Sequence, residues 1–168
     1  MKVAKELRRI GEQLRTVEAI LDEGEEKLGR RAPEVSAWSV AEQLDHLTKV
    51  LERALGLLAS GPPRLERGIN LVGRLLLAVG RLPRGVGKSP SAVRGVERPA
   101  SELRGAVARV RALVASLDDA GSALAGRHPV FPHPYFAGLT PAQTLRFLVV
   151  HTDHHLRIVA DIRRATGV

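Results

Sequence analysis

The chain has 168 residues and a formal net charge of +8; 44% of its residues are hydrophobic, 26% are charged, and none is cysteine. This length and composition predict a folded domain, and they exclude disulfide scaffolds, thiolate zinc sites, iron–sulfur clusters and cysteine nucleophiles. Any metal site must therefore use histidine and carboxylate ligands.

The first predicted helix carries apolar residues at three- and four-residue spacing from Val3 to Leu21 and ends near Gly29. Its charged, amphipathic start lacks the apolar segment of a signal peptide, so we expect a soluble cytoplasmic protein.

A second helix begins after Ser39, where Glu42 three residues later forms a capping box, and it runs to the breaker at residues 60–63. A shorter apolar helix follows at Ile69–Leu82. This run is interrupted by arginine and is too short to span a bilayer, so we expect no membrane partner.

The segment Pro83–Pro99 is rich in Gly, Pro and basic residues, which predicts a mobile loop. A further helix is expected at Ala100–Leu117 and is followed by a long, proline-bearing connection. The last helix has Thr140 as its N-cap, Pro141 in its first position and a run to about Ala165.

No stretch alternates convincingly as a strand would. The sequence therefore predicts an all-α fold, an antiparallel four-helix bundle with one extra short helix, in a single domain over residues 1–168.

The excess of positive charge is confined to the middle of the chain. Between Arg64 and Arg111 there are 11 Lys or Arg and 3 Asp or Glu. This basic region could bind an anionic partner, although solvated arginines on helices would give the same pattern. Because the region has no aromatic residue on which bases could stack, we expect no specific nucleic-acid complex.

Three histidines are candidate metal ligands. His151 and His155 lie one turn apart on the inward-facing seam of the last helix, a spacing at which two imidazoles can bind one metal ion. His46, on the edge of the second helix's leucine stripe, could converge with them, whereas His154 lies ~100° away from His155. The alternative is a set of core histidines that hydrogen-bond to their neighbours.

Three neutral imidazoles without a carboxylate would leave a divalent ion with an open coordination position. Structural sites close every position with protein, so this layout favours catalysis or ligand binding.

Two motifs resemble the DinB/YfiT-like superfamily. They are the segment Trp38–Leu47, with Trp38-Ser39 before His46-Leu47, and the segment His133–Thr140 followed by His151-x-x-His154-His155. The resemblance implies a four-helix bundle with a site for zinc, nickel or another divalent metal. By motif position its ligands are His46, His151 and His155.

Two positions depart from the family pattern. Ile158 stands where the family often has Gln, which alters the polar lining of the pocket. Ala137 stands where the motif usually has Gly, with the glycine one residue later. Neither change removes a ligand.

Aromatic and histidine residues near these motifs have alternative roles. Trp38 is expected to staple the start of the second helix onto the core. His128 and His133 are expected at exposed loop positions rather than at the mouth of the metal-site pocket. Tyr135 and Phe136 either wall the site or simply pack.

Two carboxylates adjoin the candidate ligands. Asp45 and Asp153 are expected to face away from the metal, although either could accept a hydrogen bond from an imidazole.

Relatives in the superfamily carry out metal-dependent transfer to or from low-molecular-weight thiols. The resemblance therefore implies a thiol transferase, or a hydrolase using metal-bound water, that acts on a small molecule; a homodimer is compatible with it. The alternative is a non-catalytic protein that binds an anionic partner through residues 64–111.

Overall fold

The computed structural model describes residues 2–85, 87–119, 124 and 126–167. Its elements in chain order are α1 (Lys2–Leu21), α2 (Glu25–Leu28), α3 (Val40–Ala59), α4 (Leu71–Val79), the short 3-10 turn η1 (Ser91–Val93), α5 (Ala100–Asp119), β1 (Phe131–His133), β2 (Ala137–Leu139) and α6 (Pro141–Ala165). The prediction of a mostly helical fold is confirmed.

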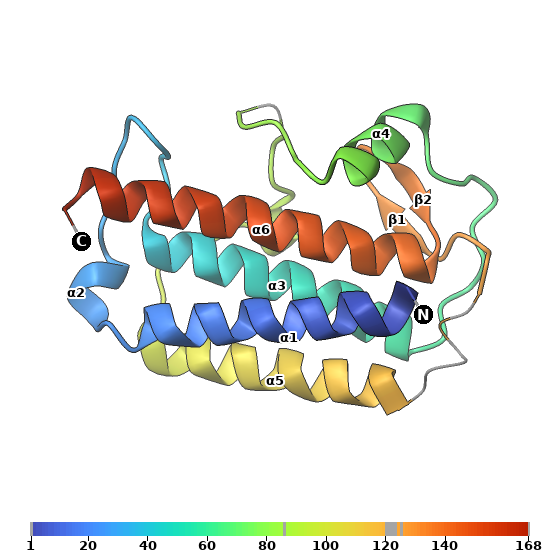
Figure 1. Ribbon diagram of the computed structural model, residues 1–168, viewed down its shortest axis with the longest axis horizontal. Coiled ribbons are helices and arrows are strands. Elements are labelled where there is room, and N and C mark those ends of the chain that lie inside the picture. The colour runs from blue at the N-terminus through green and yellow to red at the C-terminus, as the bar shows by residue number, and fades with distance from the viewer. Residues whose placement is uncertain (1, 86, 120–123, 125, 168) are drawn as a thin grey trace.

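The long helices α1, α3, α5 and α6 lie side by side (Figure 1). Each has an apolar face at helical spacing, and these faces meet in one leucine-rich core that includes Leu14, Leu44, Leu103 and Leu148. No helix within the described part of the chain is both long and apolar enough to cross a membrane.

The directions of the helices differ from the antiparallel arrangement that we expected. Two ion pairs show that α3 and α5 run in the same direction. Asp45, near the start of α3, pairs with Arg98, just before α5, at 3.0 Å. Glu52, about two turns further along α3, pairs with Arg109 of α5 at 2.7 Å. α1 and α6 also run in the same direction as each other, opposite to the first pair (Figure 1).

The cause is the long connection between α3 and α5, residues 60–99, which we call the crossover. It carries α4 and η1 and returns the chain to the end of the molecule where α3 began (Figure 1). A connection that runs back along a helix makes the next helix parallel to the one before it.

The expectation of a mobile loop at 83–99 is wrong for its second half, which is fastened to α3. The Val96 N–H donates to Asp45 at 2.9 Å, and the Lys49 ammonium donates to the Arg94 carbonyl at 3.0 Å. A Cβ on Gly95 would lie 2.1 Å from the Glu42 carbonyl oxygen, so only glycine fits at this contact. Residue 86 lies outside the described residues.

The two capped helix starts agree with the sequence, but two helices are shorter than expected, and α4 covers Leu71–Val79 instead of Ile69–Leu82. Both capping boxes are present, Ser39 with Glu42 and Thr140 with Gln143. The first helix, expected to reach Gly29, stops at Leu21, and Gly24 has a φ of 95° before the four-residue α2 begins. Glycine adopts this conformation at little cost, which permits the break.

A short β-hairpin precedes α6 and was not expected. β1 and β2 pair antiparallel, with Phe131 opposite Leu139 and His133 opposite Ala137. Each strand has three residues, too few for an alternating pattern to be recognised. Residues 121–123 and 125 of the same connection lie outside the described residues.

Candidate metal centre

His46 on α3 meets His151 and His155 on α6 in the interior between these two helices. One ring nitrogen from each lies within 4.8 Å of the other two, and the ring centres are 4.5–5.1 Å apart. The structure therefore brings the three predicted residues together, in a geometry that could hold a divalent metal ion.

The His46 ring is held from the crossover. Its Nδ1–H donates to the Val93 carbonyl at 2.6 Å, since a carbonyl can only accept. In the neutral ring this leaves the Nε2 lone pair free, and Nε2 lies 3.2 Å from Nε2 of His151.

The His155 ring is held from α3. Its Nδ1 contacts the side-chain oxygen of Gln43 at 2.6 Å, and the Gln43 amide donates in turn to the Ser36 hydroxyl at 2.9 Å. With the Gln43 oxygen facing the ring in this way, His155 donates through Nδ1 and presents Nε2. Trp38 covers this side, with ring centres 5.1 Å from His46 and 6.5 Å from His155.

His151 is the least satisfied member of the cluster. Its Nδ1 is buried and has no hydrogen-bond partner among the described residues. Phe147, one turn earlier on α6, packs against the ring at 5.3 Å between centres.

Burial favours the uncharged form of all three imidazoles. It lowers the pKa of His46 below the ordinary 6.5, and it lowers the pKa of His151 and of His155 well below that value, with a further contribution from the neighbouring rings. The neutral imidazole is the form that binds a metal.

The separation of the nitrogens fits a shared ion. Two nitrogens that each lie ~2.0–2.1 Å from one tetrahedral zinc are about 3.3 Å apart. The observed 3.2 Å between Nε2 of His46 and Nε2 of His151 agrees with this value. Because Nε2 of His46 carries a lone pair, Nε2 of His151 must either donate a proton to it or bind the same cation.

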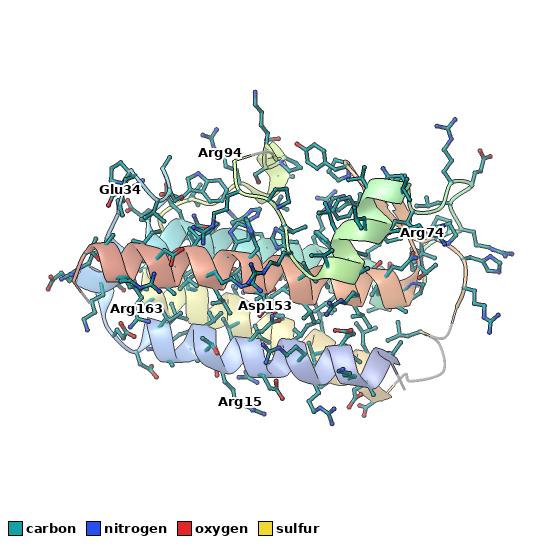
Figure 2. All side chains as sticks on the ribbon, turned by 45° about the horizontal axis from the view of Figure 1, so that its top comes forward. Arg15, Glu34, Arg74, Arg94, Asp153 and Arg163 are labelled. Atoms are coloured by element: carbon teal, nitrogen blue, oxygen red, sulfur yellow. The ribbon has the colours of Figure 1, made fainter. Side chains whose placement is uncertain are left out.

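The neighbouring polar residues point elsewhere. The Asp45 carboxylate faces Lys49, Arg98 and the Val96 amide, and so it holds the crossover rather than an imidazole. Asp153 lies between α6 and α1 (Figure 2), where it accepts from Gln13 at 2.7 Å. His154 is not part of the cluster, and its ring meets the edge of the His155 ring.

The histidines and Phe136 of the connection before α6 make structural contacts and are not part of the histidine cluster. His128 is exposed beside Arg64, as expected. His133 is half-buried in the hairpin, where its Nδ1 accepts from the backbone N–H groups of Tyr135 and Phe136, and burial lowers its pKa to about 4. Phe136 is buried against the His133 ring, with centres 4.2 Å apart.

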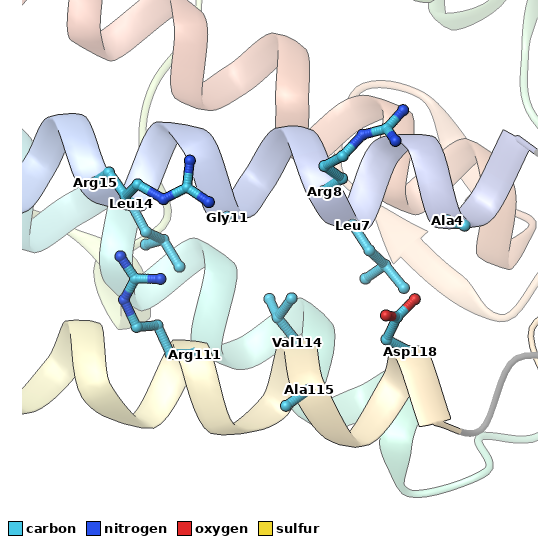
Figure 3. A pocket seen from close by; sticks show the side chains of 10 residues that line it. All are labelled: Ala4, Leu7, Arg8, Gly11, Leu14, Arg15, Arg111, Val114, Ala115 and Asp118. Atoms are coloured by element: carbon cyan, nitrogen blue, oxygen red, sulfur yellow. The ribbon is translucent and has the colours of Figure 1, made fainter.

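Two surface cavities of about 300 Å³ lie away from the histidine cluster. One is a groove between α1 and α5, into which Leu7 and Leu14 point from α1 and Val114 from α5 (Figure 3). The other is lined by the ends of α3 and α5 and by residues such as Val130 and Pro141. Neither is lined by a residue of the cluster.

Three supports of the site were not predicted. Gln43 could have been proposed from the sequence, because it lies one turn before His46 on the same helix. Trp38 was assigned to the core, yet it packs on two of the histidines. The Val93 contribution is a backbone carbonyl, for which the side-chain sequence carries no signal.

The family model of the DinB superfamily matches residues 9–159. No curated protein and no solved structure matched the chain. The match covers most of the chain, including all three histidines, the whole of α3 and most of α6. The chain therefore belongs to the DinB superfamily.

Proposed function

We propose that the protein is a metal-dependent enzyme in which a four-helix bundle holds one divalent ion through His46, His151 and His155. The observation that carries the proposal is the convergence of three imidazoles, two of which have the opposite ring nitrogen engaged by Val93 and Gln43. Imidazole donors suit zinc and nickel, and these are the ions we propose.

A bound ion would supply Lewis-acid chemistry, lowering the pKa of a coordinated water or thiol. The protein's part is to place the ring nitrogens and to limit water. Gln43 and the Val93 carbonyl fix the orientation of two rings, as partners of ligating imidazoles do in metal sites generally. Trp38 and the crossover cover the cluster.

The charge of the site favours an anionic co-ligand. The cluster formed by the described residues includes no carboxylate, since Asp45 and Asp153 both face away. Three neutral ligands would leave the charge of a divalent ion uncompensated, and a thiolate or hydroxide would balance part of it. We therefore propose a small-molecule thiol transferase or a hydrolase.

The alternative of an anion-binding face along residues 64–111 has weaker support. Five of its basic residues are paired with carboxylates in the structure: Arg84, Arg98, Arg104, Arg109 and Arg111. Their charge is thus used within the molecule and does not form one free surface.

Metal analysis tests the ligand assignment. The protein should contain about one divalent ion per chain, and His155→Ala should abolish stoichiometric binding. His154→Ala is the matched control, because His154 is the next residue on α6 and lies outside the cluster; it should keep the ion. The reverse pattern would mean that another set of residues holds the metal.

Cobalt substitution tests the proposed chemistry. With Co²⁺ bound, addition of a small thiol should produce a sulfur-to-metal charge-transfer band, and this band should be absent in His155→Ala. A cobalt spectrum that does not respond to thiols would remove the transferase branch and leave hydrolysis.

A further inference from the structure

The outward face of α4 is unusually apolar. Four aliphatic side chains are exposed there: Leu71 at 80%, Val72 at 60%, Leu75 at 62% and Val79 at 63%. At ~100° per residue they occupy about 100° of the helix surface. A contiguous exposed apolar patch of this kind marks an interaction surface more often than chance exposure.

The orientation of this helix is fixed by contacts on its other side. A Cβ on Gly73 would lie 2.8 Å from Cβ of Phe136, so the helix sits as close to the hairpin as glycine permits. The Asn70 N–H donates to the Phe136 carbonyl at 3.0 Å, and the Arg146 guanidinium donates to the Leu77 carbonyl at 3.2 Å. Turning α4 to bury its aliphatic face would break all three contacts.

Positive charge borders the apolar face. Exposed cations stand before, within and after α4 at Arg67, Arg74 and Arg81, and exposed Lys88 bonds to Tyr135 beside the start of the helix. Arg74, labelled in Figure 2, projects from the helix ~60° from Leu71. None of the four has a carboxylate within ion-pair distance among the described residues, in contrast to the paired cations of α5.

An amphipathic aromatic side chain lies beside the start of α4. Tyr135 is 50% exposed, its carbonyl accepts from the Asn70 side chain at 2.8 Å, and its hydroxyl bonds to the backbone of Lys88 at 2.9 Å and 3.1 Å. Tyrosines of this kind, with an apolar ring and a satisfied polar tip, are favoured at the boundary between lipid and water.

We propose that this surface, the α4 face (Leu71, Val72, Leu75 and Val79 with Arg67, Arg74, Arg81 and Lys88), docks on the surface of an anionic lipid bilayer. Its aliphatic stripe enters the interfacial layer while the flanking cations meet lipid phosphates. We expected no membrane partner because the apolar run is too short to span a bilayer, but an interfacial helix needs only one exposed apolar face.

Charge favours lipid over a second copy of the chain as the occupant. In a symmetric contact through α4, two faces that are both basic would meet, each with four exposed cations and one exposed carboxylate nearby, Glu66. An anionic bilayer offers an apolar layer and negative charge on one surface, which is the complement of what the α4 face presents.

Co-sedimentation with vesicles tests the proposal. The wild-type chain should pellet with vesicles of phosphatidylcholine and phosphatidylglycerol in equal parts, and much less with phosphatidylcholine alone. The double variant L71S/L75S should weaken the partition coefficient by about tenfold or more. The variant R74Q/R81Q should weaken it by about tenfold or more and remove about half of its salt dependence, since Arg67 and Lys88 remain.

The control is Val96→Ser, because Val96 is 45% exposed and lies outside the α4 face; its vesicle binding should equal that of the wild type. Every substituted residue is exposed, so the helical circular dichroism should not change. The proposal would be overturned if wild-type vesicle binding did not depend on phosphatidylglycerol, or if L71S/L75S bound vesicles as well as the wild type. So would a wild-type dimer in sedimentation velocity that L71S/L75S converts to a monomer, since a second copy would then cover the face.

Discussion

Replacing Asp45 by alanine should loosen the candidate metal centre without changing a histidine. The carboxylate is buried, with 3% of the side chain exposed, and it accepts from Lys49 at 2.5 Å, Arg98 at 3.0 Å and the Val96 amide at 2.9 Å. Val93, whose carbonyl orients His46, lies three residues before the Val96 anchor. The substitution therefore releases the segment that holds one of the candidate ligands.

The expected loss of stability follows from the exposure of the partners. Removing one member of a buried ion pair costs about 3–5 kcal/mol when the other charge stays buried. Lys49 and Arg98 are 26% and 41% exposed and can turn to water, whereas the Val96 N–H loses its acceptor. We therefore expect a loss of about 2–4 kcal/mol, or roughly 5–15 °C in Tm for a chain of this size.

Thermal unfolding by circular dichroism and metal titration by calorimetry measure the two effects. Metal affinity should fall by roughly tenfold or more, as for other residues that orient ligands. Glu102→Ala is the control, because it removes a second partner of Arg98 from an exposed pair and should shift Tm by no more than about 1–2 °C. If Asp45→Ala and Glu102→Ala have the same Tm, the buried carboxylate does not anchor the crossover.

Three further outcomes are expected. Chelation of the metal should leave the helical circular dichroism in place, because the core of the four long helices is formed without the site; loss of helicity would identify the metal as structural. Burial lowers the pKa of His133 to about 4 from 6.5, so the unfolded chain binds the extra proton between these values and stability should fall as pH drops through this range. His133→Asn, with urea unfolding measured at pH 7 and pH 5, should flatten this dependence relative to wild type, and an unchanged slope would contradict it. Ala137 has a φ of 64°, so Ala137→Gly should raise the free energy of unfolding by up to about 1 kcal/mol, whereas a decrease would mean that the left-handed backbone is not strained.

The helix faces on which the histidines lie could be predicted because helical geometry is local, whereas the set of three ligands was implied by the family resemblance. Once Thr140 and Gln143 set the start of α6, the register of that helix placed His151 and His155 on one face, and no tertiary information was needed. The capping box at Ser39 set the register of α3 in the same way, and this placed His46 at the edge of its apolar stripe.

The supports of the cluster depend on tertiary routing instead. Val93 contributes a backbone carbonyl from a segment with no helical period, and its approach to His46 depends on the contact between Gly95 and Glu42. The directions of the helices were missed for the same reason. Whether α5 runs with or against α3 depends on where the crossover carries the chain, and composition alone does not determine that path.

The shared direction of α3 and α5 bears on how the chain folds. Among the long helices, α3 and α5 are the consecutive pair that packs extensively, and α1 and α6 pack on each other from opposite ends of the sequence. No helical hairpin of adjacent long helices can therefore form first and serve as a template. Large loops must close before the core gains its contacts, which costs chain entropy early and predicts slower folding than in up-and-down bundles of similar length. His46 and Val93, on opposite sides of such a loop, would come together only after that closure, so the metal centre would be among the last parts of the molecule to form.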